Sequence, residues 1–236
     1  MHYHISAFGV YRGPWARAVQ SYERIMASPA SIHYVTLIRQ PWSHYLSYYY
    51  YYKEPQTQVP ITRYLEGDGV IRNPLASEFG LRSKQEVNEF IEKYLPGMFV
   101  ILTDRFDEGL VLLKRMLGWE LIDMTYSVVM ETDEGVKRYD GKTLKRVPKF
   151  DDLPKKVQTD IKKHTWLDSL LYQGAKRQYE KYLEVDGPAL EPEVLEFQAL
   201  QEEVNGYLDS NSTTRATKWY RGNVQCYGAA LPTTPF

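Results

Sequence analysis

Two short runs of β-branched and aromatic residues set the strongest limit on how this chain folds. Residues 33–38 read HYVTLI and residues 98–103 read MFVILT. Neither run alternates apolar and polar residues, which is typical of strands buried on both faces, and each leads directly into a helical pattern. Strand, helix, strand, helix in this order predicts an α/β domain with a parallel sheet flanked by helices.

The predicted helices carry start and stop signals. Ahead of the second run, Ser83 and Glu86 have the spacing of a capping box. Behind it, Asp107 and Glu108 are predicted to cap a helix that ends near Gly118. The apolar face of the helix after Ser83 consists of Val87, Phe90, Ile91 and Tyr94.

The second half of the chain is predicted to be mostly helical. A helical pattern resumes after residue 152, and Thr165 and Asp168 form a further capping-box candidate. We expect a domain over residues 1–185, followed over residues 186–236 by an acidic amphipathic helix and a flexible C-terminal tail.

Charge and cysteine content exclude several classes of protein. A net charge of −1 argues against nucleic acid as a partner, because binding many phosphates needs a clear basic excess. The single cysteine allows neither an internal disulfide nor a cysteine-based metal site. No apolar run is long enough for a membrane span, and the first residues lack the pattern of a signal peptide.

The residues after the first predicted strand suggest a phosphate site. Arg39 follows the strand at its carboxyl end, where open α/β sheets bind ligands, and Pro41 is suited to the first turn of a helix. Ser47 comes eight residues after Arg39. A guanidinium group binds phosphate through two charge-assisted hydrogen bonds, and a serine on the adjoining helix adds a hydroxyl donor.

The segment RQPWSHYLS resembles the 3′-phosphate-binding segment of sulfotransferases, although Gln40 stands where those enzymes usually have Asp. Further segments narrow the resemblance to the galactose-3-O-sulfotransferase family, which includes galactosylceramide sulfotransferase. The most specific is FDEGLVLLKRMLGW, in which Gly109 replaces a serine of the family motif. The resemblance covers roughly residues 33–184; its other segments are YVTLIRQP, IRNPLASEFGL and WLDSLLYQ.

The resemblance implies a P-loop-like sulfotransferase fold and a function. The co-substrate would be 3′-phosphoadenosine 5′-phosphosulfate, its 3′-phosphate held by Arg39 and Ser47, and the acceptor a galactose hydroxyl of a glycolipid or glycan. His4 is the candidate catalytic base, with His2 in reserve, and no metal is required. Family members lie in the Golgi membrane or lumen, whereas no anchor or signal is visible in this chain.

One departure from the family concerns the 5′-phosphosulfate. The family holds it in a Lys-Thr-Gly-Ser-type loop, and no such segment precedes residue 33. The GKT at residues 141–143 does not replace it, because the spacing to the preceding glycine is wrong for a Walker loop. We therefore expect a fold without its first βα unit, belonging to a fragment, an incomplete gene model or a degenerate relative. The alternatives to an active sulfotransferase are an inactive nucleotide- or glycan-binding relative of that family and an unrelated adaptor protein.

Two further features bear on ligand binding. Five consecutive tyrosines, Tyr48–Tyr52, are expected to divide between core packing and solvent, where exposed rings could stack on adenine or a sugar. Residues 137–163 hold ten Lys or Arg against four Asp, which indicates either a solvated face or a surface that attracts an anionic nucleotide. The candidate residues for attracting such a nucleotide are Lys137, Arg138, Lys145 and Arg146.

Overall fold

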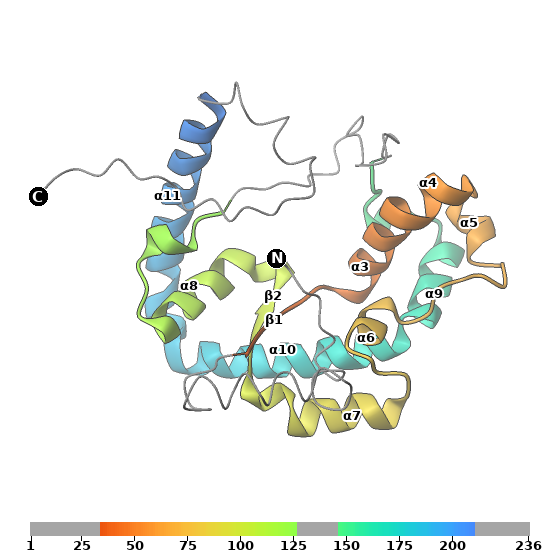
Figure 1. Ribbon diagram of the computed structural model, residues 1–236, viewed down its shortest axis with the longest axis horizontal. Helices are drawn as coiled ribbons and strands as arrows, with labels where there is room; N and C mark the ends of the chain where they lie inside the picture. The colour runs from red at the N-terminus through yellow and green to blue at the C-terminus, as the bar shows by residue number, and fades with distance from the viewer. Residues whose placement is uncertain (1–33, 127–145, 211–236) are drawn as a thin grey trace, which may run out of the picture.

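The computed structural model describes residues 34–126 and 146–210. These residues form helices around one small parallel sheet (Figure 1). Its two strands, β1 (Tyr34–Ile38) and β2 (Met98–Leu102), pair with Tyr34 opposite Met98 and Ile38 opposite Leu102. The predicted α/β class with a parallel strand pair is confirmed at this level.

Helices make up most of the described chain. The α-helices are α3 (Pro41–Tyr48), α4 (Glu54–Thr57), α5 (Ile61–Tyr64), α6 (Pro74–Glu78), α7 (Lys84–Lys93), α8 (Phe106–Leu117), α9 (Lys155–His164), α10 (Trp166–Asp186) and α11 (Leu190–Ser210). Shorter 3₁₀ segments cover Leu95–Gly97, Thr103–Arg105, Leu121–Met124, Phe150–Asp152 and Gly187–Ala189. The helix predicted in the acidic segment is therefore present as α11.

Two of the predicted helix signals are confirmed. The amide of Glu86 donates to the Ser83 hydroxyl at 3.2 Å, and the amide of Ser83 donates to the Glu86 carboxylate at 3.0 Å, so a capping box starts α7. Gly118 ends α8 in the left-handed conformation, with φ of 68°, as expected of a glycine at this position.

The two strands differ in burial. β2 is buried along most of its length, as predicted. The same prediction is wrong for β1, where Val35 is 41% and Leu37 is 51% exposed. The reason is tertiary packing: α8 and α10 cover β2, whereas within the described residues β1 packs chiefly against β2.

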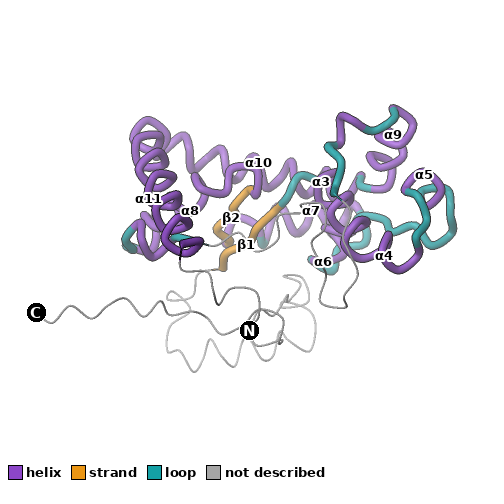
Figure 2. Tube along the Cα trace, turned by 90° about the horizontal axis from the view of Figure 1, so that it is seen from above, coloured by secondary structure: helices purple, strands orange, loops and turns teal. Residues whose placement is uncertain are grey.

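The apolar side chains form two clusters. The larger includes β2 and the buried faces of α6, α7, α8, α10 and α11. The smaller joins α3, α5 and α9 through Tyr45, Tyr49, Tyr64 and Ile161, among others. Figure 2 shows the matching arrangement, with α8 and α11 at one end, α5 and α9 at the other, and α10 running between them.

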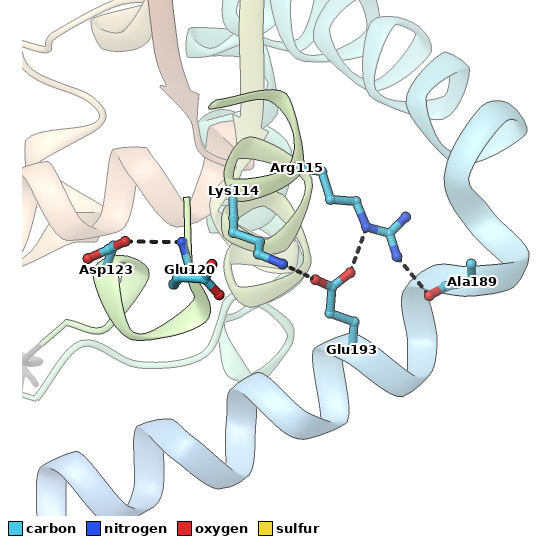
Figure 3. A network of polar contacts seen from close by, with 6 residues as sticks. All are labelled: Lys114, Arg115, Glu120, Asp123, Ala189 and Glu193. Carbon is cyan, nitrogen blue, oxygen red and sulfur yellow. Dashed lines mark hydrogen bonds and ion pairs between the residues drawn. The ribbon is translucent and has the colours of Figure 1, made fainter. Parts of the chain in front are cut away.

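A network of charges fastens α11 to α8 (Figure 3). Lys114 Nζ lies 2.7 Å and Arg115 Nε lies 2.6 Å from the carboxylate of Glu193. Arg115 also donates to the carbonyl of Ala189 at 2.8 Å. Burial alone would raise the pKa of Glu193, but its hydrogen bonds with both cations hold that pKa below the usual value.

Two predicted caps are wrong. No side chain caps α8; Asp107 instead accepts a hydrogen bond from Tyr126 at 2.8 Å, and Glu108 accepts one from Tyr179 at 2.7 Å. Thr165 and Asp168 form no capping box either. The carboxylates of Asp107, Glu108 and Asp168 accept from distant parts of the fold, because tertiary packing supplies donors that local spacing does not reveal. The Thr165 hydroxyl donates instead to the carbonyl of Ile161 at 2.9 Å.

Candidate functional site

The carboxyl edge of the sheet is the candidate site. Arg39 is the first residue after β1, and the strand register places Thr103, the first residue after β2, at the same edge. Gln40 is extended, with ψ of 129°, and Pro41 begins α3 in the predicted way. Arg39 as a whole residue is exposed at this edge.

The two residues predicted to hold phosphate lack polar partners in the described part of the chain. Arg39 makes no ion pair there, and the Ser47 hydroxyl makes no hydrogen bond. Desolvation of part of the side chain lowers the pKa of Arg39, but a guanidinium remains charged at neutral pH. A charged donor and a hydroxyl are thus both available to an anion.

Ser47 lies on α3 outside the buried face of that helix. The buried face of α3 consists of Pro41, Tyr45 and Leu46. Ser43 and Ser47 are four residues apart, one turn along the helix, and both stay partly accessible away from that face. The Ser43 hydroxyl donates to the side chain of Gln40 at 3.2 Å, whereas the Ser47 hydroxyl has no hydrogen-bond partner within residues 34–126 and 146–210.

The tyrosine run continues α3 as a π-helical segment, Tyr49–Lys53. Tyr49 is fully buried and donates to the carbonyl of Val59, whereas Tyr52 is 45% exposed and lies 5.1 Å from the Tyr48 ring. The predicted division of the tyrosine rings between the core and the solvent is confirmed. The accessible rings follow Ser47 directly in the sequence, at the end of α3 and in the π-helical segment.

The histidines contribute less than expected to the described site. The candidate base His4 and its reserve His2 lie outside the described residues, as does His33. His44 lies on α3, and its Nε2 is 3.4 Å from the Glu78 carboxylate. His164 ends α9 as predicted, but burial lowers its pKa, so its position at the helix end does not stabilise the cation overall.

A second arginine at the sheet edge escaped the sequence analysis. Arg105 ends the 3₁₀ segment Thr103–Arg105 that follows β2, and it immediately precedes α8. Its Nη2 lies 2.5 Å from Glu108, and its guanidinium carbon lies 5.3 Å from the centre of the Tyr179 ring. The repeated order of strand, arginine and helix was the available signal.

In the basic segment, residues 137–163, several of the described lysines contact other side chains of the fold. Lys137, Arg138 and Lys145 lie outside the described residues, and Arg146 is exposed. On α9, Lys156 pairs with Glu66, and Lys162 lies over the rings of Trp42 and Phe150 at 5.8 and 5.6 Å. These contacts favour the interpretation of a solvated face for this helix.

A hollow of about 540 Å³ lies elsewhere, along α7, and contains none of the predicted site residues. Its lining comes entirely from that helix: Lys84, Gln85, Asn88, Glu89, Glu92 and Lys93. Across residues 34–126 and 146–210, no group of three or more His, Cys, Asp or Glu is placed to hold a metal ion. No helix in the same ranges has both the length and the apolar character that crossing a bilayer requires.

Comparison with known proteins gave no match: no protein-family model, no curated protein and no solved structure matches this chain.

Proposed function

We propose that the carboxyl edge of β1 binds the 3′-phosphate of 3′-phosphoadenosine 5′-phosphosulfate, and that the chain is a carbohydrate sulfotransferase. The acceptor would be a galactose hydroxyl on a glycolipid or glycan. A P-loop-like sulfotransferase fold is part of the same proposal. The observation that carries it is the position of Arg39, which is exposed at a parallel strand end without an ion-pair partner among the described residues.

The binding chemistry follows from this position. The guanidinium can donate two hydrogen bonds to one phosphate group, and the Ser47 hydroxyl can donate a third. Hydrogen bonds to charged groups contribute about 1.5–3 kcal/mol each. Losing the Arg39 contact should therefore weaken binding by roughly 10- to 150-fold.

The transfer step needs one base and no change in redox state. The acceptor oxygen attacks sulfur, the bond between sulfur and the bridging phosphate oxygen breaks, and adenosine 3′,5′-bisphosphate leaves. The acceptor proton passes to a base, for which we propose His4. General bases of this kind work best when their pKa lies near the working pH, as is common for histidine.

The first experiment is a calorimetric titration of the full chain with adenosine 3′,5′-bisphosphate. Arg39→Ala should weaken binding by at least about tenfold. The matched control is Arg63→Ala, which removes an exposed arginine on α5 and should leave affinity unchanged. Equal affinity of wild type and Arg39→Ala, with both proteins folded, would refute the proposed site.

The second experiment tests turnover with a labelled sulfate donor and galactose-containing acceptors. Transfer that is abolished by His4→Ala supports the enzyme and its proposed base. Saturable nucleotide binding without transfer would favour the alternative, an inactive nucleotide-binding relative. Absence of any nucleotide binding by the folded chain would favour a protein that acts through its surface contacts alone.

A further inference from the structure

The carboxyl end of β2 carries polar side chains that the proposed phosphate site does not use. Two hydrogen bonds join the residues after this strand to α10. The Tyr172 hydroxyl donates to Asp104 Oδ2 at 3.0 Å, and the Tyr179 hydroxyl donates to Glu108 Oε1 at 2.7 Å. Arg105 Nη2 lies 2.5 Å from Glu108 Oε2. We name these five side chains the Asp104 cluster.

The Asp104 cluster lies beside the proposed phosphate site. The parallel register places Arg39, after β1, and Thr103, after β2, at the same edge of the sheet. Neighbouring strands are about 4.8 Å apart, and Asp104 directly follows Thr103. Ligands held at the two strand ends therefore meet along this edge, which is where open α/β sheets bind them.

The cluster is fixed on its inner side and accessible on its outer side. Tyr179 is 0% exposed, and the centre of its ring lies 5.3 Å from the guanidinium carbon of Arg105. This ring and Glu108 hold the guanidinium, although the Arg105 side chain is still 41% exposed. Asp104 is exposed and Tyr172 is partly exposed. Binding sites commonly combine an ordered inner layer with a few accessible polar groups of this kind.

Several polar atoms of the cluster have no partner within residues 34–126 and 146–210. Asp104 Oδ1 accepts no hydrogen bond there, and Arg105 Nε and Nη1 donate none. The hydroxyl oxygen of Tyr172 can also accept, because a phenol is both donor and acceptor. A ligand rich in hydroxyl groups matches this mixture, since each hydroxyl donates one hydrogen bond and accepts others.

The charge of this strand end favours a neutral ligand over an anion. Residues 104–108 hold three carboxylates and one guanidinium. Their excess negative charge repels a phosphate or sulfate group. Arg39, in contrast, makes no ion pair with any described residue. The two strand ends therefore suit different ligands, an anion at β1 and a neutral, hydroxyl-rich molecule at β2.

We infer that the Asp104 cluster is a carbohydrate-binding subsite, which takes a neutral sugar through neighbouring hydroxyl groups. Asp104 Oδ1 accepts a hydrogen bond from one hydroxyl, and Arg105 donates one to the oxygen of the next. The Tyr172 hydroxyl accepts from a third. The further assignment of this sugar as the galactose acceptor rests on the proposed sulfotransferase function, whereas sugar binding itself does not.

The test is a titration of the full chain with methyl β-galactoside, followed by saturation-transfer nuclear magnetic resonance of the ligand. The wild type should bind saturably. Asp104→Ala should weaken binding by at least about tenfold, because it removes a charged acceptor, and Tyr172→Phe should weaken it roughly two- to tenfold. The matched control is Asp68→Ala, which removes an exposed aspartate between α5 and α6 and should leave affinity unchanged. Circular dichroism verifies that each variant is folded.

Three results would overturn the inference. They are no galactoside binding by the folded wild type, equal affinity of wild type and Asp104→Ala, and binding of galactosamine without binding of the neutral galactoside. Calorimetry of the same samples with adenosine 3′,5′-bisphosphate separates this inference from the proposed function. Galactoside binding that depends on Asp104 supports the subsite even where no nucleotide binds. Nucleotide binding without galactoside binding overturns the subsite and leaves the phosphate site standing.

Discussion

Gly109 gives the sharpest test of how the sheet and α8 pack. A methyl group at this position would lie 2.7 Å from Cγ2 of Ile101 and 3.3 Å from its Cβ and Cγ1. Ile101 is 1% exposed in the middle of the sheet pair, and a β-branched side chain in a strand has little rotamer freedom to move aside. Gly109→Ala therefore forces the helix and strand apart or strains Ile101.

The expected magnitude is the balance of two terms. Overpacking a well-filled core costs about 1–3 kcal/mol. Replacing glycine by alanine inside a helix returns about 1 kcal/mol. We expect Gly109→Ala to destabilise the chain by a net of about 0–2 kcal/mol, measured by urea unfolding followed by circular dichroism.

Two comparisons make this result decisive. Gly206→Ala in α11 has no atom within 4 Å of the added methyl group and should gain about 0.5–1 kcal/mol. Ile101→Ala removes both obstructing γ-carbons, so the double variant with Gly109→Ala should lose less stability than the sum of the single variants. The steric argument is refuted if Gly109→Ala is as stable as Gly206→Ala, or if the two losses simply add.

Three further predictions concern polar groups. Glu193→Gln should lower the free energy of unfolding by roughly 1 kcal/mol at pH 7, measured by urea titration. The difference between the variant and the wild type should shrink below pH 4. The reason is that a lowered pKa of Glu193 stabilises the fold fully only above the carboxyl pKa of the unfolded chain. Burial raises the pKa of Asp168 in the folded chain to about 6, above its value in the unfolded chain, so the wild type should lose stability as pH rises from about 4 to about 6. Asp168→Asn should flatten this pH profile of stability in thermal scans. An unchanged slope in the variant would refute the assignment of the pH dependence to Asp168. Tyr49→Phe leaves the carbonyl of Val59 without this donor and should cost about 1–2 kcal/mol in chemical unfolding, whereas Tyr52→Phe, on an exposed ring, should be nearly neutral.

The sequence by itself determined the features that depend on neighbouring residues. The strand positions, the capping box at Ser83, the glycine end of α8 and the start of α3 behind Arg39 are all present. Each rests on a signal contained within a few residues, such as a side chain that reaches its own helix start. That locality also made Arg39 and Ser47 recognisable as a candidate pair.

The tertiary structure alone decided which distant groups meet. A capping residue is recognised by its spacing, yet Asp168 serves amides 92 and 93 residues away, and Asp107 and Glu108 bond to tyrosines instead of their own helix. The composition of β1 predicted burial, but burial depends on which elements cover a strand: α8 and α10 cover β2, and Val35 and Leu37 of β1 stay exposed. Partners of this kind are set by the folding of the whole chain, because hydrogen bonds and burial act between atoms that are close in space regardless of their separation in sequence.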